Sequence, residues 1–282
     1  PLGAGSRYSF RIDGNITVPD PASRFQPEGV HGPSEVVDLR SIRELAGPAS
    51  PGRAWEESIL YELHTGTFSA EGSFEGIRRR LDHLSELGVT GPELMPIGAF
   101  PGERNWGYDG VLPFAPSAAY GRPEELAGLI RAVHERRLDL LLDVVYNHFG
   151  PEGNYLHLYA APFFTDRFET PWGAAIDFSL QEVRRYFLEN AMLWTEVYGF
   201  DGLRIDAVHA VKDESERHFV DELAEAVHLR AEATGRRVHV VLENEENQAS
   251  RLGIATAQWN DDIHHLIHVL LTGEDEGYYQ DY

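Results

Sequence analysis

The 282 residues include 46 acidic side chains and 24 lysines and arginines, which gives a formal net charge of −22 with neutral histidines. This balance argues against nucleic acid as the main partner, because phosphate binding relies on basic patches that release counterions. Hydrophobic residues make up 42% of the chain, which is enough to build a core, and the length allows one large α/β domain or two smaller ones. We interpret the negative charge as a solvated surface.

The sequence contains no cysteine. This excludes a disulfide framework, a thiolate metal site and a catalytic thiol, and it is compatible with a reducing cytoplasm. No apolar run approaches the roughly 20 residues of a membrane-spanning helix. Residues 1–5 lack the basic and then apolar pattern of a signal peptide. We therefore expect a cytoplasmic protein without a membrane partner.

The chain divides near residues 48–51, where prolines cluster. Before this point, residues 7–12 alternate as in a strand, residues 13–15 have the composition of a turn, and prolines interrupt residues 18–21. Two or three strands alone rarely hold together in water. We therefore interpret residues 1–50 as the end of a β module and a linker, and expect earlier strands of that module to be absent from the sequence.

From Ile59 onward, short apolar runs alternate with stretches of helical periodicity. The expected strands cover residues 59–64, 89–94, 138–145, 202–205, 238–242 and 257–259. The expected helices cover residues 74–87, 123–136, 181–198, 214–234 and 263–271. A Gly- and Pro-rich loop over residues 96–122 and an insertion over residues 146–179 interrupt the pattern.

This alternation predicts a parallel sheet, and the absence of a glycine-rich dinucleotide loop favours a (β/α)8 TIM barrel over a doubly wound sheet. A closed barrel of eight strands needs two more units than the six found in residues 51–282. We therefore expect an α/β chain whose barrel is incomplete at its C-terminal end.

Acidic residues follow the apolar runs at the end where barrel enzymes carry their active sites. Asp143, Asp206 and Glu243 each stand at the C-terminal end of such a run. Arg204 and Asp206 are two residues apart on one strand, so they share a face, and the guanidinium can keep the carboxylate ionised as a nucleophile requires. Glu243, in a less polar setting, could stay protonated and act as the general acid of glycoside hydrolysis. Any one of these carboxylates alone is more often an N-cap or a surface ion pair, but their joint placement favours an active site.

Three segments resemble signature regions of the α-amylase superfamily, glycoside hydrolase family 13. Asp-Val-Val-Tyr-Asn-His at residues 143–148 resembles the first region, Gly-Phe-Asp-Gly-Leu-Arg-Ile-Asp-Ala-Val-His at residues 199–209 the second, and Leu-Glu-Asn-Glu at residues 242–245 the third. Within the superfamily the chain is most similar to the maltooligosyltrehalose trehalohydrolases. This resemblance rests on residues 61–68, 93–96, 105–111, 148–155 and 258–262, and residues 19–33 match the end of that family's N-terminal β-sandwich.

The resemblance implies a role for each matching residue. Asp206 would be the nucleophile that forms a β-glycosyl ester, and Glu243 the acid/base. Arg204 would hold Asp206 in place, Asp143 would brace the site from beneath, and His148 would hydrogen-bond the sugar that is cleaved.

Aromatic and acidic residues at the edge of the site would contact the rest of the substrate. Tyr108 would stack beneath the sugar ring, although a core tyrosine is an equally good interpretation of its spacing. The loop around Trp106 would add aromatic surface to an open cleft. His209 could touch the leaving group or simply cap a helix. The candidates for contacts to the leaving part of the substrate are Trp259, Asp261 and Asp262.

The resemblance implies hydrolysis, with retention, of the α-1,4 bond next to the terminal trehalose unit of maltooligosyl trehalose. The partner would be an α-1,4-glucan with a trehalose end, and the product trehalose. No spaced group of carboxylates or histidines suggests a metal, and we expect no cofactor. The third carboxylate of the superfamily, an Asp in a His-Asp pair of the seventh barrel unit, has no counterpart here. A branching or debranching enzyme, or an inactive glucan-binding fragment, therefore remain as alternatives.

Overall fold

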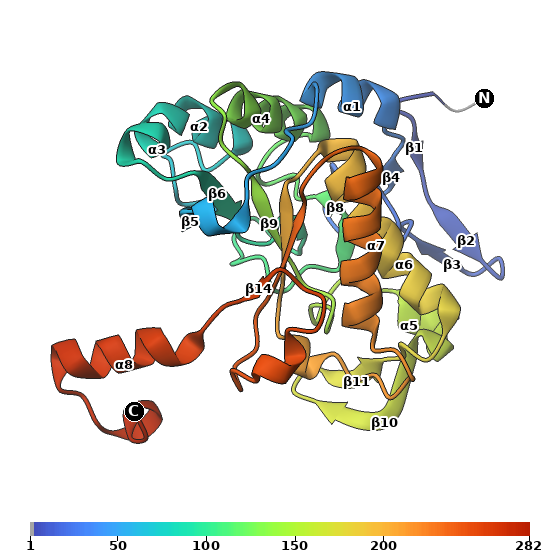
Figure 1. Cartoon of the computed structure of the whole chain (residues 1–282). Coiled ribbons are helices and arrows are strands. Elements are labelled where there is room, and N and C mark those ends of the chain that lie inside the picture. Colours follow the sequence, from blue (N-terminus) through green and yellow to red (C-terminus); the bar gives the residue numbers. More distant parts are fainter. Residues whose placement is uncertain (1–2) are drawn as a thin grey trace.

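A six-stranded parallel sheet forms the centre of the computed structural model, which describes residues 3–282 (Figure 1). The strands lie across the sheet in chain order: β5 (Leu60–Leu63), β6 (Gly91–Leu94), β9 (Leu141–Val144), β12 (Gly202–Ile205), β13 (His239–Leu242) and β14 (Ala257–Gln258). Each neighbouring pair is parallel. Successive units of a (β/α) barrel are arranged in this way, so the prediction of a partial (β/α) barrel is confirmed.

Helices connect the strands and cover the sheet (Figure 1). They are α2 (Phe74–Arg79), α3 (Leu81–Leu87), α4 (Pro123–Glu135), α6 (Gln181–Met192) and α7 (Phe219–Ala233). The six strand segments that the sequence predicted are all present, most of them shorter at one or both ends.

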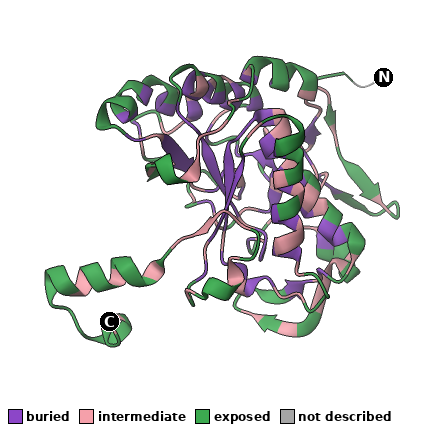
Figure 2. Ribbon diagram, in the orientation of Figure 1, coloured by how far each residue is buried: buried purple, intermediate pink, exposed green. Residues whose placement is uncertain are grey.

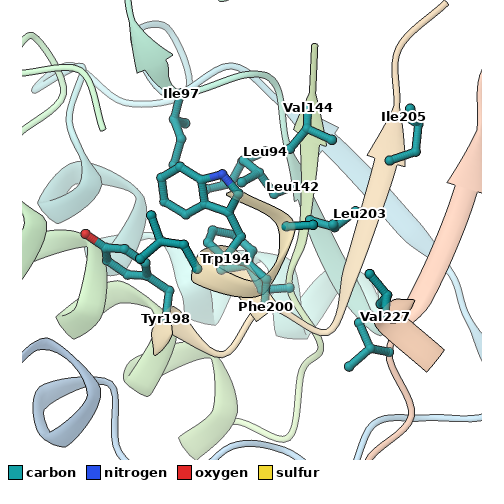
Figure 3. Close-up of a cluster of buried hydrophobic side chains, with 14 of the residues drawn as sticks. Leu94, Ile97, Leu142, Val144, Trp194, Tyr198, Phe200, Leu203, Ile205 and Val227 are labelled. Atoms are coloured by element: carbon teal, nitrogen blue, oxygen red, sulfur yellow. The ribbon is translucent and has the colours of Figure 1, made fainter. Parts of the chain in front are cut away.

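The core lies between the strands and these helices, where the strands are buried and the outer helical faces exposed (Figure 2). Leu142 of β9 and Leu203 of β12 pack with Trp194 and Phe200, and all four side chains are at most 1% exposed (Figure 3). Full burial of each such side chain stabilises the fold by about 1.5–3 kcal/mol. The indole Nε1 of Trp194 donates to Asn190 Oδ1 at 3.1 Å, so this large core residue leaves no polar atom unsatisfied.

The N-terminal segment consists of short strands and one helix. Strand β2 (Phe10–Ile12) pairs with β3 (Ile16–Val18) in an antiparallel hairpin, and its turn is at the predicted residues 13–15. The predicted strand over residues 7–12 is two strands, because β1 (Arg7–Tyr8) pairs instead with β4 (Ser34–Glu35). Pro1 and Leu2, part of the segment we tested for a signal pattern, lie outside the described residues.

Helix α1 (Leu39–Ala46) was not predicted and packs against α4. Its N-cap Asp38 accepts a hydrogen bond from the backbone N–H of Arg40 at 3.0 Å. The 3-10 turn η1 (Trp55–Glu57) follows and leads into β5.

Two predicted helices change their winding part of the way along. The segment over residues 74–87 divides at Arg80, whose φ of −106° and ψ of 7° leave the helical region while its guanidinium donates to the carbonyl of Phe68 at 2.6 Å. The segment over residues 181–198 ends in a π-helix, Leu193–Tyr198 (η3). There the hydroxyl of Thr195 bonds to the carbonyl of Ala191 at 2.8 Å, a contact that competes with the α-helical ladder.

The long loop and the insertion contain structure that the sequence did not predict. The loop forms the hairpin β7 (Gly98–Ala99) and β8 (Leu112–Pro116). The insertion forms α5 (Leu156–Tyr159), the turn η2 (Ala161–Phe163) and the hairpin β10 (Phe164–Thr170) and β11 (Gly173–Ile176). Helix α7 begins at Phe219 rather than at residue 214, because Asp213 accepts from the backbone N–H groups of Ser215 and Phe219 in the preceding loop.

Helix α8 (Asp261–Thr272) extends away from the rest of the molecule and carries no buried residue (Figures 1 and 2). Three short 3-10 turns complete the chain: η4 (Val208–Ala210), η5 (Ala249–Arg251) and η6 (Gly277–Tyr279). Within residues 3–282, none of the helices combines the length and the apolar character needed to cross a membrane.

Candidate active site

The strand ends bring the predicted carboxylates to one edge of the sheet. Asp143 lies in β9 directly opposite Arg204 of β12. Asp206 and Glu243 follow β12 and β13, and their backbone N–H groups extend the sheet ladder to Val144 at 3.1 Å and to Ile205 at 3.0 Å. Parallel pairing in register therefore places Asp143 beside Arg204, 61 positions later in the sequence.

Arg204 lies at the centre of this group. Its Nη1 donates to Asp143 Oδ2 at 2.9 Å and to Asp206 Oδ1 at 2.7 Å, and its Nη2 lies 3.8 Å from Glu243 Oε2. Burial of the guanidinium favours its neutral form, but the carboxylates of Asp143 and Asp206 outweigh this effect and raise the pKa of Arg204 above its ordinary value. The group therefore has a permanent positive charge at its centre.

Asp206 accepts a hydrogen bond at each of its two carboxyl oxygens. Its Oδ1 accepts from Arg204, and its Oδ2 accepts from the side-chain amide of Asn147 at 2.8 Å. About 13% of its side chain is exposed, so the carboxylate can be reached. Asn147 is a residue that the sequence analysis did not single out, although it lies inside the first signature segment.

Glu243 has different surroundings. Its Oε2 accepts from the backbone N–H of Ala207 at 2.7 Å, and 14% of its side chain is exposed. Burial raises the pKa of the Glu243 carboxyl, while the charge of Arg204 opposes the shift. Ala207, which follows Asp206 in the chain, has a φ of +43° and so occupies the strained left-handed region. Because of this backbone conformation, the N–H of Ala207 points toward the Glu243 carboxyl.

Asp143 lies beneath the other two carboxyls and is buried. Its Oδ2 also accepts from the hydroxyl of Tyr108 at 2.9 Å. Burial raises the pKa of Asp143 to about 7, and Arg204 holds it from rising further. The hydroxyl of Tyr108 is thus anchored in the site, which fixes the position of its ring.

His148 lies beside Tyr108 and Trp172. Its Nε2 bonds to the carbonyl of Tyr108 at 2.9 Å, and its Nδ1 contacts Asn147 Oδ1. Burial lowers the pKa of His148, so the neutral ring is favoured. The indole of Trp172, between β10 and β11, stacks on this ring with centroids 4.1 Å apart. Trp172 is a second residue that the sequence analysis missed, since nothing in its local pattern links it to His148.

Two further candidate residues, Trp106 and His209, are not part of the group of carboxyls around Arg204. Trp106 is 75% exposed and lines a cavity of about 760 Å³ together with His64 and Tyr120. His209, in η4, has its Nε2 3.5 Å from Glu245 Oε2.

Trp259 follows β14, and its indole lies 6.1 Å from the ring of Trp55, between centroids. Asp261 begins α8, and its charge is one of the causes that raise the pKa of Glu243, which means that it lies near the site. Asp262, the second residue of α8, accepts from the hydroxyl of Tyr282 at 3.2 Å, and within residues 3–282 no hydrogen bond joins it to Asp143, Asp206 or Glu243. In the part of the chain that the structure describes, no three His, Asp or Glu side chains are grouped so as to hold a metal ion.

The chain was compared with families and individual proteins. The family model "Alpha amylase, catalytic domain" matches residues 46–161. Malto-oligosyltrehalose trehalohydrolase from Deinococcus radiodurans is 45% identical over 100% of this chain and 46% of its own length. The enzyme of the same name from Saccharolobus solfataricus is 44% identical over 99% of this chain and 50% of its own length. The chain thus spans about half the length of the curated relatives that it matches.

Two further similarities complete the comparison. The 1,4-alpha-glucan branching enzyme from Jannaschia sp. is 31% identical over 73% of this chain and 33% of its own length. The 1.4 Å crystal structure of a Salmonella typhimurium protein assigned as an alpha amylase superposes with a TM-score of 0.89 and 43% identity, covering 99% of this chain and 49% of that protein. The chain therefore has an α-amylase-type catalytic fold, and over nearly its whole length it is similar to the malto-oligosyltrehalose trehalohydrolases.

Proposed function

We propose that the complete protein is a retaining glycoside hydrolase that cleaves the α-1,4 bond next to the terminal trehalose unit of maltooligosyl trehalose and releases trehalose. The observation that carries this proposal is the different environment of two neighbouring carboxyls. Arg204 and Asn147 both donate to Asp206, whereas burial raises the pKa of Glu243. Glycoside hydrolysis needs this division between an ionised and a protonated carboxyl.

In the first step, the carboxylate of Asp206 attacks the anomeric carbon and forms an ester. The bond from this carbon to the glycosidic oxygen breaks, and Glu243 gives its proton to that oxygen. Arg204 donates to Asp206 Oδ1 at 2.7 Å and so holds the attacking carboxylate in position until the ester forms. Trehalose is the leaving group, and it departs as a neutral alcohol.

In the second step, Glu243 is ionised and acts as a base. It takes a proton from water, whose oxygen attacks the anomeric carbon while the ester bond to Asp206 breaks. Two inversions at the same carbon give overall retention. The site is then restored, with Asp206 ionised and Glu243 protonated.

Neighbouring residues would hold the sugar in this process. The fixed ring of Tyr108 offers an apolar face to a pyranose. His148 would hydrogen-bond a sugar hydroxyl by exchanging one of its two present contacts, to the carbonyl of Tyr108 or to Asn147 Oδ1. Trp106, His209, Trp259 and Asp261 would extend the binding surface away from the carboxylates. Asp262 is the weakest of these candidates, because its carboxylate is engaged with Tyr282.

The complete protein would supply what this chain does not contain. We assign residues 1–50 to the end of an N-terminal β-sandwich module and its linker, and residues 51–282 to the first six units of the catalytic barrel. The third catalytic carboxylate would come from a seventh unit. The expected setting is trehalose biosynthesis in the cytoplasm, which suits a chain without cysteine.

A competition experiment tests the substrate. Maltotriosyl trehalose and maltopentaose are given to the complete enzyme at equal concentration, and the products are separated by chromatography. We expect a higher kcat/KM for maltotriosyl trehalose, with trehalose as the main disaccharide product. Similar kcat/KM values for both substrates, or glucose and maltose as the main products, would indicate an ordinary amylase activity and would leave the two catalytic carboxyls in place.

A glucan branching enzyme is the second candidate, because the Jannaschia enzyme of that name is 31% identical to this chain. It would use the same nucleophile, but would transfer a glucan to another chain or act on α-1,6 bonds. Incubation with amylose and analysis of the products for new α-1,6 linkages distinguishes the two. A chain that binds glucan without cleaving any of these substrates would be the inactive alternative.

A further inference from the structure

A cavity of about 850 Å³ lies at the opposite end of the sheet from the catalytic carboxyls. Linker residues 48–54 form one wall, and the C-terminal end of α4 forms another. Asp139 and Arg237, which precede β9 and β13, also line it, so the cavity opens at the N-terminal ends of the strands. Nothing in the proposed hydrolysis uses this part of the molecule.

The cavity gathers positive charge on a strongly acidic protein. Arg53, Arg131, Arg137 and Arg237 all line it. Arg131 pairs with Glu135 at 3.0 Å. For the other three guanidinium groups, residues 3–282 provide no carboxylate within 4 Å. Two further acidic residues, Glu57 and Asp139, line the cavity, so the arginines outnumber the acidic residues there, in a chain of net charge −22.

Two buried nitrogens at the cavity have no hydrogen-bond partner in the described part of the chain. One is Nε of Arg53, and the other is Nδ1 of His134, whose side chain is only 8% exposed. The opposite nitrogen of His134, Nε2, is engaged by Asp201 Oδ2 at 2.8 Å, which fixes the ring. Both nitrogens lie beneath the surface of the cavity, so a ligand would contact the exposed guanidinium groups rather than these two atoms.

Arg137 occupies a backbone position that favours glycine. Helix α4 ends in a Schellman motif, in which the N–H of Leu138 bonds to the carbonyl of Val133 at 3.2 Å and that of Arg137 to the carbonyl of His134 at 2.9 Å. Arg137 is the residue with positive φ in this motif, at +58°. An arginine is strained there, and such strain is commonly found at ligand sites.

The walls of the cavity are fixed in place. The backbone N–H of Arg237 donates to the carbonyl of Pro51 at 2.8 Å, and Nε of Arg236 donates to that of Ser50 at 3.1 Å. Gly52 has a φ of +75°, and a Cβ at this position would lie 2.2 Å from the carbonyl oxygen of Arg237. The linker is therefore held against the segment before β13, and this contact fixes one wall of the cavity that the arginines line.

We propose that this cavity binds the phosphate group of a small molecule, one per chain. Guanidinium groups match the charge and the fork geometry of phosphate oxygens. The volume is that of a site for a metabolite-sized ligand, and the large negative charge of the rest of the surface repels polyanions such as nucleic acids. The phosphate source is either free inorganic phosphate or a phosphorylated sugar.

Titration calorimetry on the complete protein tests this site, with inorganic phosphate, glucose 6-phosphate and neutral glucose as probes. The variant combines Arg137→Gln with Arg237→Gln. Both side chains are exposed and make no side-chain hydrogen bond within residues 3–282, so the fold should persist, and a melting curve checks this. Arg40→Gln is the matched control, because Arg40 is an exposed arginine on α1 outside the cavity.

We expect one equivalent of at least one phosphate probe to bind, and the double variant to weaken this binding about tenfold or more. Arg40→Gln should leave it unchanged. Equal affinity for both phosphate probes identifies free phosphate as the source, and tighter binding of glucose 6-phosphate identifies a phosphorylated sugar. The proposal is overturned if neither probe binds at millimolar concentration, if the double variant binds as wild type does, or if glucose binds as well as glucose 6-phosphate. Calorimetry needs no turnover, so this result is independent of the proposed hydrolysis.

Discussion

Arg204 hydrogen-bonds Asp206 at 2.7 Å but lies 3.8 Å from Glu243, and single substitutions can test whether these two carboxyls have different roles. Asp206→Asn should abolish turnover, because no other carboxylate has a comparable position. Glu243→Gln should remove protonation of the leaving oxygen only. A substrate with a good leaving group needs no proton, so it should partly restore the first step in Glu243→Gln and have no effect on Asp206→Asn. Release of the leaving group, followed spectroscopically, measures both. Activity above a few per cent of the wild-type value in Asp206→Asn would mean that another residue is the nucleophile.

Stereochemistry tests the same pair of residues. If Asp206 is a nucleophile, its carboxyl and that of Glu243 should be roughly 5–5.5 Å apart in the complete enzyme, and the product should be released first as the α-anomer. An NMR time course of the newly formed reducing end checks this. Initial release of the β-anomer would indicate inversion, with a separation of about 6.5–9.5 Å.

Glu93, in β6, is a buried carboxyl near the side chain of Trp259, and within residues 3–282 its two oxygens make no hydrogen bond of 3.5 Å or shorter. Burial, assisted by the charge of Asp143, raises its pKa to about 8. The folded state therefore keeps this proton to a higher pH than the unfolded state does. The resulting stabilisation is complete below the ordinary Glu value of 4.5 and is lost as the pH rises towards about 8.

Replacement of this residue by glutamine should flatten the pH dependence of stability. Between pH 4.5 and about 8, the unfolding free energy of the wild type should fall by up to about 5 kcal/mol more than that of Glu93→Gln. Urea unfolding at a series of pH values measures the difference. The control is Glu86→Gln, since Glu86 is exposed on α3. If the unfolding free energies of the wild type and of Glu93→Gln change with pH in the same way, the pKa of Glu93 is not raised in the folded state.

At the scale of elements, one buried arginine joins α6 to the loop before α7 and to α7 itself. Arg184 donates to the carbonyls of Phe178 and Arg217 at 2.7 Å and 2.9 Å, and it pairs with Asp213 and Glu222. The side chain of Asp213 is fully buried. Packing between α6 and α7 therefore depends on a charge at the contact.

Arg184→Met should be strongly destabilising, because it leaves Asp213 buried without its cation. We expect a loss of about 3–5 kcal/mol in unfolding free energy, measured by chemical denaturation. The neighbouring Arg185→Met is the control, because Arg185 is 79% exposed and its ion pair with Glu189 contributes little. Equal effects of the two variants would show that the buried network does not stabilise the contact between the helices.

The hairpin of β10 and β11 shows how an element can act far from its own sequence neighbours. The hairpin belongs to the insertion, yet Trp172 at its tip covers the ring of His148. Only the path of the insertion across the strand ends brings the two rings together. The sequence indicated an insertion over residues 146–179, but neither its hairpin nor this stacking.

At the scale of the whole molecule, α8 extends from the rest of the protein, and none of its residues is buried (Figure 2). The exposed apolar residues on this helix are Ile263, Leu266, Ile267, Leu270 and Leu271. Leu270 and Leu271 are 73% and 80% exposed. A contiguous patch of this kind promotes association in water.

The 282-residue chain should therefore self-associate in a concentration-dependent way, and Leu270→Lys with Leu271→Lys should reduce this association. Light scattering measures the mean molecular mass. Leu229→Lys is the control, because Leu229 is an isolated exposed leucine on α7 with a similar exposure of 57%. Association that persists in the double lysine variant would assign it to another surface.

The order of strands and helices and the chemistry at the strand ends followed from the sequence itself. Apolar runs predicted the strands that form the sheet because a parallel sheet covered by helices buries both faces of each strand. The same logic placed Asp143, Asp206 and Glu243 at one edge, since strand ends in a parallel sheet lie together. Arg204 and Asp206 share a face because side chains alternate along a strand. These are short-range rules, so they can be read from a linear sequence.

Contacts between distant segments were decided only by the tertiary structure. The hydrogen bond from Asn147 to Asp206, the stacking of Trp172 on His148 and the position of Arg137 beside the linker each join residues that no local pattern connects. The pKa shifts belong to the same class, because burial depends on what packs around a carboxyl rather than on its neighbours in the chain. The sequence alone therefore indicated which groups could react and on which edge of the sheet they stand, whereas folding decided the surroundings of each carboxyl, because only the packed structure sets its distance to Arg204 and to water.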